Sequence, residues 1–244
     1  MKAGAAPSPV VGRQSWRDLV FLHWKLPPEV VRPAVPLPFD LEMPDGSAWV
    51  GIVAFFVRGL RPRFAPFGLS FLETNLRTYV TWNGRPAIWF LTLDAASRLA
   101  VAGARVGYGL PYRHARMRAS RDGDALEYGH VRGDGAEFQV RCRVGAALGP
   151  AATGTLEHFL VERYRFYVLR AGRVLETEVR HAPYLLHAAT VDAVEESLFS
   201  PAGLPPARGA PLAHFSPGVD VELLATRRAP EQVESSLGRT GGTR

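Results

Sequence analysis

The sequence predicts a mainly β (α+β) fold, in which an antiparallel sheet is curved or closed into a barrel and two or three helices lie at its periphery. Three observations predict it. Two-residue turn signals, of which Asn83-Gly84 is the strongest, recur between runs of apolar and β-branched residues. These runs have the lengths of strands, and few stretches have the composition of a helix. Many hairpins with few helices are typical of a barrel or of a packed antiparallel sheet.

The expected strands follow from the turn signals. Asp45-Gly46 precedes an apolar run over 47–57 that suits a buried strand. Asn83-Gly84 joins 76–82 to 88–93, because this dipeptide accepts the positive φ angles of a type I′ turn. Asp122-Gly123, Asp134-Gly135 and Ala171-Gly172 separate the next pairs. They predict strands over 114–120, 125–132, 136–145, 164–170 and 174–181, and a last strand is expected over 219–226.

Three stretches are expected to be helical. Residues 95–105 are rich in alanine and leucine, and Thr155 has the residue type that caps a helix over 156–164. Residues 28–35 are expected to form a short turn of helix.

We expect a flexible tail over 1–14, a single domain over 15–228 and a disordered tail over 229–244. Both tails are rich in small and polar residues, and no long linker or repeat divides the part between them. A length of 244 residues fits one large domain better than two.

Composition narrows the class of protein. No stretch approaches the apolar length that spans a membrane, the N-terminus lacks the apolar core of a secretory signal, and a single cysteine cannot form an internal disulfide. We therefore expect a cytoplasmic protein with no membrane partner. The net charge of +6 comes almost entirely from arginine, but the arginines are spread along the chain without a binding motif. A solvated surface is favoured over nucleic-acid binding.

A series of motifs in fixed order resembles the YqjF-like family, also called DUF2071, from about Trp16 to Thr226. The series runs Trp16-Arg-Asp-Leu-Val-Phe-Leu-His23-Trp24, Asp45-Gly46-x-Ala-Trp49-Val-Gly51, Glu73-Thr-Asn75-Leu-Arg77-Thr-Tyr79-Val, Trp89-Phe-Leu-Thr-Leu-Asp94-Ala, Ala104-Arg105, Gly109-Leu-Pro111-Tyr112 and Leu156-Glu157-x-Phe159-Leu-x-Glu162-Arg163-Tyr164. The resemblance implies kinship with acetoacetate decarboxylases, and hence a barrel of that type with a central pocket.

The same resemblance argues against the best-known chemistry of those enzymes. Their Gly-x-Pro-Lys-Lys segment carries a lysine that forms a Schiff base and a second lysine that lowers the pKa of the first. The similar segment here is Gly109-Leu-Pro111-Tyr112-Arg113. Neither a phenol nor a guanidinium forms an imine. A Schiff-base decarboxylase is therefore not expected, and whether the protein is an enzyme stays open.

Glu73 is the candidate catalytic residue. With a period of two along a strand, Glu73, Asn75 and Arg77 share one face, while Leu72, Leu76 and Val80 occupy the other. Such a polar face is either exposed, with an ordinary ion pair, or lines a polar cavity. The resemblance favours the cavity, because acetoacetate decarboxylases place a pocket glutamate in a similar strand.

Arg105, Tyr112 and Arg113 complete the candidate ligand-binding set. The two arginines suit an anion clamp, since a guanidinium binds carboxylates bidentately. The alternative is surface charge or a bridge to Asp94 or Glu73. We expect Glu73 and at least one of Arg105 and Arg113 to point into a common cavity.

The remaining chemical groups predict no second site. The seven histidines show no metal-ligand spacing, and neither a metal nor a cofactor is expected. His23 lies in an apolar, aromatic stretch, where a hydrogen-bonded core residue is favoured. Cys142 is expected to be buried and inert, because strand alternation turns it away from Arg141 and Arg143.

Three functions stay open at this point. The first is a small-molecule-binding barrel, possibly catalytic, for an anionic or carbonyl-bearing ligand without Schiff-base chemistry. The second is a non-catalytic ligand-binding or regulatory module. The third is a structural or interaction protein with a vestigial pocket. The expected partner is a small, anionic molecule, and self-association into a homo-oligomer is left open.

Overall fold

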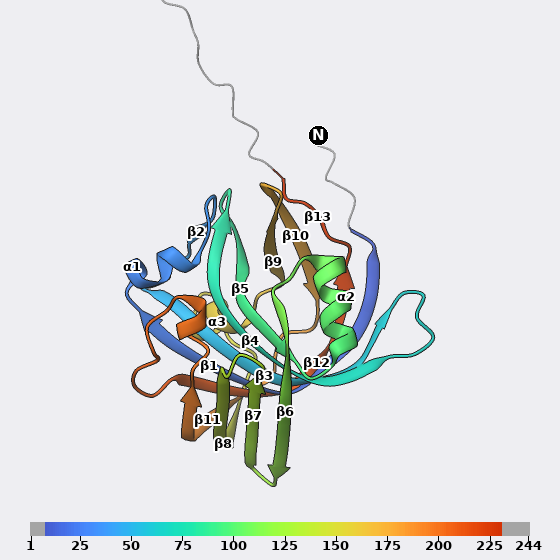
Figure 1. Cartoon of the computed structure of the whole chain (residues 1–244). Helices are drawn as coiled ribbons and strands as arrows, with labels where there is room; N and C mark the ends of the chain where they lie inside the picture. Colours follow the sequence, from blue (N-terminus) through green and yellow to red (C-terminus); the bar gives the residue numbers. More distant parts are fainter. Residues whose placement is uncertain (1–7, 231–244) are drawn as a thin grey trace, which may run out of the picture.

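A computed structural model describes residues 8–230, and its architecture is mainly β (Figure 1). Thirteen strands of this region form one mixed sheet with helices at its margins. The strands are β1 (Val10–Leu26), β2 (Asp40–Leu41), β3 (Ala48–Pro62), β4 (Leu69–Trp82), β5 (Arg85–Ala95), β6 (Tyr112–Asp122), β7 (Ala125–Arg132), β8 (Glu137–Gly149), β9 (Arg165–Arg170), β10 (Arg173–Arg180), β11 (Leu186–Glu196), β12 (Leu212–Leu224) and β13 (Arg227–Arg228).

The sheet closes on itself at β5. One edge of β5 pairs with β4 along its whole length, and the other edge pairs with β6 near its end and with β9 near its start. From β6 the strand order runs through β7, β8, β11, β12, β1 and β3 back to β4. A shorter circuit passes from β9 through β10 to β12, because β12 also pairs with β10. Strands β12, β1, β3, β4 and β5 therefore belong to two lobes.

Both faces of the shared strands are buried, so their side chains alternate between two cores. Leu22 on β1 and Ile52 on β3 face the core that β7 and β8 complete. Phe21 and Val53, their neighbours in sequence, face the second core, which α2 and α3 cover. Strands that are buried on both faces have near-continuous apolar sequences, as the run over 47–57 has.

The helices are α1 (Pro28–Val31), α2 (Arg98–Tyr108) and α3 (Leu156–Val161), with two short 3-10 turns at Arg32–Ala34 and Ser200–Ala202. Ser97 caps α2 by accepting a hydrogen bond from the Ala100 amide, and Gly109 ends it in a left-handed conformation. The predicted cap of α3 is confirmed, since the Thr155 hydroxyl accepts a hydrogen bond from the His158 amide.

The strongest turn prediction is confirmed in detail. Asn83 and Gly84 have φ angles of 51° and 70° between β4 and β5. Ala171 and Gly172, with φ angles of 49° and 71°, make the same kind of turn between β9 and β10. Positive φ at both central positions is the geometry of a type I′ turn, whose twist matches that of the paired strands.

Several boundaries and one pairing rule differ from the predictions. β1 begins at Val10, so residues 10–14 pair with β12 rather than forming part of a tail, and Gly12 and Arg13 also pair with β3. α2 begins at Arg98, because Ala95 is still the end of β5, and α3 ends at Val161. The sheet is mixed, not purely antiparallel: α2 returns the chain so that β6 runs parallel to β5. Of the C-terminal segment, residues 231–244 lie outside the described residues.

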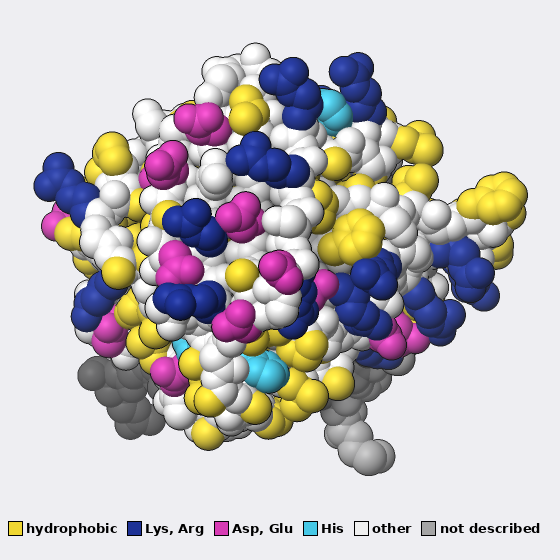
Figure 2. Space-filling view, turned by 90° about the horizontal axis from the view of Figure 1, so that it is seen from below, with side chains coloured by type: hydrophobic (Ala, Val, Ile, Leu, Met, Phe, Trp, Pro, Cys, Tyr) yellow, Lys and Arg dark blue, Asp and Glu magenta, His cyan; other side chains and the backbone are white. Residues whose placement is uncertain are grey.

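The surface mixes charges of both signs. On the face shown in Figure 2, basic side chains lie among acidic ones, and the protruding β3–β4 hairpin carries hydrophobic groups beside arginines. Phe64 and Phe67 at this hairpin are 91% and 82% exposed. Within residues 8–230, none of the helices has the length and apolar character needed to span a membrane.

Cys142 gives a test of the strand alternation. It lies on β8 with no exposed surface, and burial raises the pKa of its thiol to about 11. Because maleimide reacts with an accessible thiolate, we expect native protein at pH 7 to be labelled at least about a hundredfold more slowly than unfolded protein. Mass spectrometry of samples with and without denaturant checks this. Rapid labelling of the native protein would show that β8 has another register.

Candidate functional site

A cavity of about 620 Å³ lies in the lobe formed by β9 and β10. Its walls come from β1, β3, β4 and β5, with α2, β9 and β10 completing the enclosure. Most of the lining is aliphatic or aromatic, and includes Leu19, Phe21, Val53, Phe55, Phe71 and Leu93. A concave, largely apolar site with a few convergent polar groups is typical of small-molecule binding.

The polar groups of this cavity come mainly from one strand. Glu73, Asn75 and Arg77 are alternate residues of β4, all at most 6% exposed, and all three line the cavity. Leu76, on the opposite face of β4, packs in the other core. The expected shared face is therefore correct, and it faces a cavity rather than solvent. A rise of about 3.3 Å per residue spaces Glu73 and Arg77 about 13 Å apart along the strand.

Glu73 is hydrogen-bonded to a phenol. The Tyr112 hydroxyl donates to Glu73 Oε2 over 2.8 Å, which joins the start of β6 to β4. Burial raises the pKa of Glu73 to about 7, although the hydrogen bond from Tyr112 opposes this; the negative charge of Asp94 adds to the rise. Burial also raises the pKa of Tyr112 well above its usual value, with the charge of Glu73 contributing. The pair therefore holds a proton that Glu73 exchanges near neutral pH.

Arg77 is a buried cation without a carboxylate partner in the described part of the chain. Its Nη2 donates to the Leu160 carbonyl over 3.0 Å, and its Nε has no hydrogen-bond partner. Phe21 and Tyr79 lie beside the guanidinium, each with its ring centre 5.8 Å away. Aromatic faces attract a cation but do not neutralise it.

The other two arginines of the cavity are paired with carboxylates. Arg163 is 3.0 Å from Glu42, and Arg165 is 2.8 Å from Glu178. Arg77 is thus the arginine of the cavity wall that has no carboxylate partner among the described residues. Asn75 lies between Glu73 and Arg77, and its Oδ1 is also without a partner. Arg77 Nε and Asn75 Oδ1 are both enclosed, and neither has a hydrogen-bond partner among the described residues.

The structure does not bring Arg105 and Arg113 into the cavity, so the expectation that one of them shares it with Glu73 is wrong. Arg105 is exposed on α2 and donates from Nε to the Tyr112 carbonyl over 2.7 Å. Arg113 pairs with Asp134 over 3.4 Å at the surface. The reason is the alternation of β6: once Tyr112 faces the cavity, Arg113 must face away. Of the second group of candidates, only Tyr112 lines the cavity.

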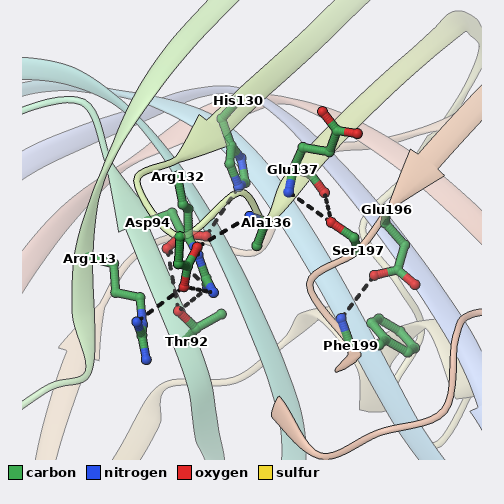
Figure 3. A network of polar contacts seen from close by, with 11 residues as sticks. Thr92, Asp94, Arg113, His130, Arg132, Ala136, Glu137, Glu196, Ser197 and Phe199 are labelled. Carbon is green, nitrogen blue, oxygen red and sulfur yellow. Dashed lines mark hydrogen bonds and ion pairs between the residues drawn. The ribbon is translucent and has the colours of Figure 1, made fainter. Parts of the chain in front are cut away.

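Arg113 belongs instead to a polar network of residues on and beside β5, β6 and β7 (Figure 3). Asp94, on β5, is fully buried and lies 3.1 Å from His130 and 3.8 Å from Arg132, both on β7. Arg132 also contacts Asp134, the partner of Arg113. The network ties β5, β6 and β7 together beside the parallel pairing, and so fixes the strand that carries Tyr112.

The prediction for His23 is confirmed. His23 is a buried core residue whose Nε2 lies 2.9 Å from the Tyr79 hydroxyl, and burial lowers its pKa well below the usual value. Lys25 is half exposed and pairs with Asp45 over 2.8 Å, away from the cavity. Lys2, the other lysine, lies outside the described residues.

Sequence reasoning missed two features. The first is Arg163, which the sequence placed only within a motif. This arginine follows the end of α3 and lines the cavity. The contact between Asp94 and His130 was not predicted either, because these residues lie 36 positions apart in the sequence and give no local signal. Residues 8–230 contain no group of three histidine, cysteine or acidic side chains placed to hold a metal ion.

Comparison with known proteins supports this architecture. Residues 13–220 match the model of the DUF2071 family, described as an uncharacterized conserved protein. The chain is 35% identical over 221 residues to the uncharacterized protein YqjF of Bacillus subtilis (strain 168), covering 88% of this chain and 91% of YqjF.

Solved structures with much lower identity share the fold. The acetoacetate decarboxylase of Legionella pneumophila matches with a TM-score of 0.64 at 13% identity, covering 94% of this chain and 92% of that one. The enduracididine biosynthesis enzyme MppR, complexed with pyruvate, matches with a TM-score of 0.64 at 13% identity and 93% coverage of both chains. The chain therefore belongs to the DUF2071 family and has the fold of the acetoacetate decarboxylase-like enzymes.

Proposed function

We propose that the cavity binds a small organic anion or carbonyl compound, with its negative group at Arg77, and that Glu73 exchanges a proton beside it. The observation that carries the proposal is the buried guanidinium of Arg77, which no carboxylate of residues 8–230 neutralises. A buried charge is costly unless it is paired, and a ligand carboxylate supplies the missing partner.

The ligand classes bound by relatives are compatible with this proposal. MppR has been crystallised with pyruvate, which carries both a carboxylate and a carbonyl group. In this chain Asn75 lies between Arg77 and Glu73, so its amide suits a carbonyl oxygen next to a carboxylate held at Arg77. Glu73, which is hydrogen-bonded to Tyr112, is then the titratable group that would exchange a proton with the ligand.

A second candidate is a binding module without catalysis. Tyr112 stands in the position that the resemblance gives to the nucleophilic lysine, and no lysine of the described chain lines the cavity. Removal of the nucleophile leaves the binding groups in place. The two candidates share the ligand site at Arg77 and differ in the role of Glu73.

The role of Arg77 is tested by replacing it with methionine, with Arg105→Met as the matched control. Loss of a charge-assisted contact of about 1.5–3 kcal/mol weakens binding roughly 10- to 100-fold. Calorimetric titration with pyruvate should show this loss for Arg77→Met and unchanged affinity for Arg105→Met, because Arg105 is exposed outside the cavity. Equal affinities of both variants and of the unmodified protein would rule out Arg77 as the anion site.

The proton held by Glu73 is tested by Glu73→Gln. In the folded protein the pKa of Glu73 is raised to about 7, so the folded state binds this proton more tightly than the unfolded state. Stability from this group is therefore full below the unfolded pKa and is lost as the pH rises toward 7. Glutamine does not ionise, so its stability relative to glutamate should increase by up to about 3 kcal/mol between pH 4 and pH 8.

Urea unfolding of both proteins across this range measures the difference. Glu178→Gln is a suitable control, because arginines lower the pKa of this carboxyl and the sign of the effect reverses. A stability difference for Glu73→Gln that does not change with pH would show that folding does not raise the pKa of Glu73.

The absence of imine chemistry is tested by trapping. With Tyr112 and Arg113 in place of the lysine pair and Lys25 outside the cavity, we expect acetylacetone and borohydride to leave no stable adduct at residue 25. Peptide mass mapping detects such an adduct. A mass increase on Lys25 would make that residue a nucleophile and would contradict the proposal.

A further inference from the structure

The polar and apolar parts of the cavity are separated along β4. Arg77 lies at one end, beside Gly51 and Phe90 on the neighbouring strands. Toward the start of β4 the cavity-lining residues become Phe71 and then Leu69, which pair with Val57 and Leu60 of β3. The wall thus changes from cationic to apolar over eight residues, which is about 26 Å of strand.

The apolar part continues to the β3–β4 hairpin. Pro66 and Phe67 of the loop line the cavity, and Leu99 faces it from α2. Phe67 and Leu99 are nevertheless 82% and 68% exposed, so the apolar end opens toward solvent. Exposed apolar side chains around an apolar opening are a marker of a binding surface.

The size of the cavity exceeds what a three-carbon acid fills. A volume of about 620 Å³ lies well inside the range of roughly 300–1,000 Å³ that holds drug-sized ligands. A ligand that satisfies only Arg77 and Asn75 would leave the wall formed by Phe55, Phe71 and Leu69 in contact with water. An apolar tail on the ligand removes this wall from water and adds binding energy.

We infer that the ligand is an amphipathic carboxylic acid, whose carboxylate binds Arg77 and whose hydrocarbon or aryl tail lies along the apolar wall toward the β3–β4 hairpin. This inference rests on the proposed anion site and adds the class of ligand and its direction in the cavity. In the opposite orientation, the carboxylate of the ligand would lie at the apolar opening and bind the arginines of the hairpin. Arg61 and Arg63 line a smaller neighbouring cavity of about 370 Å³.

The test is a titration of the full-length protein with straight-chain acids from acetate to octadecanoate. Each buried methylene contributes about 0.8 kcal/mol, so affinity should rise about fourfold for each added carbon until the tail reaches the hairpin. Octanol and octylamine serve as probes with the same tail and no negative charge. Both should bind at least about tenfold more weakly than octanoate.

Variants then fix the direction of the ligand. Arg77→Met should weaken octanoate binding by about tenfold or more, while Arg61→Gln, at the apolar opening, should leave it unchanged. Leu69→Trp should shorten the longest acid that gains affinity without affecting acetate. Thermal unfolding of each variant shows whether it is folded, and the octanol and octylamine comparison does not depend on any variant.

The outcomes separate the two proposals. If acetate and pyruvate bind through Arg77 but affinity does not grow with chain length, the anion site stands and the amphipathic ligand is wrong. If octanoate binding is lost in Arg61→Gln and kept in Arg77→Met, the direction is reversed and the inference is overturned. If octanol and octylamine bind as well as octanoate, the proposed anion site itself fails.

Discussion

The closure of the sheet at β5 is the constraint on which the rest of the molecule depends. β4 holds one edge of β5 along ten paired positions, and the other edge is divided between β6 and β9. This division produces two lobes from one sheet. It also leaves β4 with buried residues on both faces, so a shift of its register by one residue would exchange the contents of the two lobes.

The polar side chains in the cavity follow from this arrangement. Leu76 fills the core of one lobe, so the alternate residues of β4 must face the other. There the chain carries Glu73, Asn75 and Arg77, which contribute little to packing and bury groups that prefer water. Glu73 accepts a hydrogen bond from Tyr112, and Arg77 donates one to the Leu160 carbonyl, but burial of a carboxyl group, an amide and a guanidinium at these sites has a free-energy cost that apolar side chains would not have. Such a cost at a cavity wall is typical of a functional site.

The features that sequence alone could predict are those set by local geometry. Asn83-Gly84 specifies its turn through backbone angles, and Thr155 specifies the start of a helix. The burial of Cys142 follows from the alternation of side chains along β8. The shared face of Glu73, Asn75 and Arg77 follows from the same period of two. The features that escaped prediction are set by distant contacts. The parallel pairing of β5 and β6 and the contact of Asp94 with His130 depend on how the lobes close.

The positions of Arg105 and Arg113 outside the cavity follow from strand geometry and from the exposed face of α2. Tyr112 and Arg113 are consecutive residues of a strand, so only one of them could face the cavity with Glu73. The resemblance pointed to the position of the pair, but alternation decides which member is inside. Tyr112 is inside, and its hydroxyl rather than a guanidinium contacts Glu73. The cavity therefore gains a neutral hydrogen-bond donor at this position and no charge.

The presence of a neutral tyrosine at position 112, where the resemblance places a lysine, determines the electrostatics of the whole cavity. Burial raises the pKa of both Tyr112 and Glu73, so at pH values below about 7 neither group carries a charge. Arg163 and Arg165 are paired with Glu42 and Glu178, whereas Arg77 has no carboxylate partner among the described residues. Ionisation of Glu73 as the pH rises would oppose the charge of Arg77. An anion bound at Arg77, as proposed, would therefore be coupled to the proton on Glu73: the anion would favour the neutral form of Glu73, and the neutral form would favour the anion.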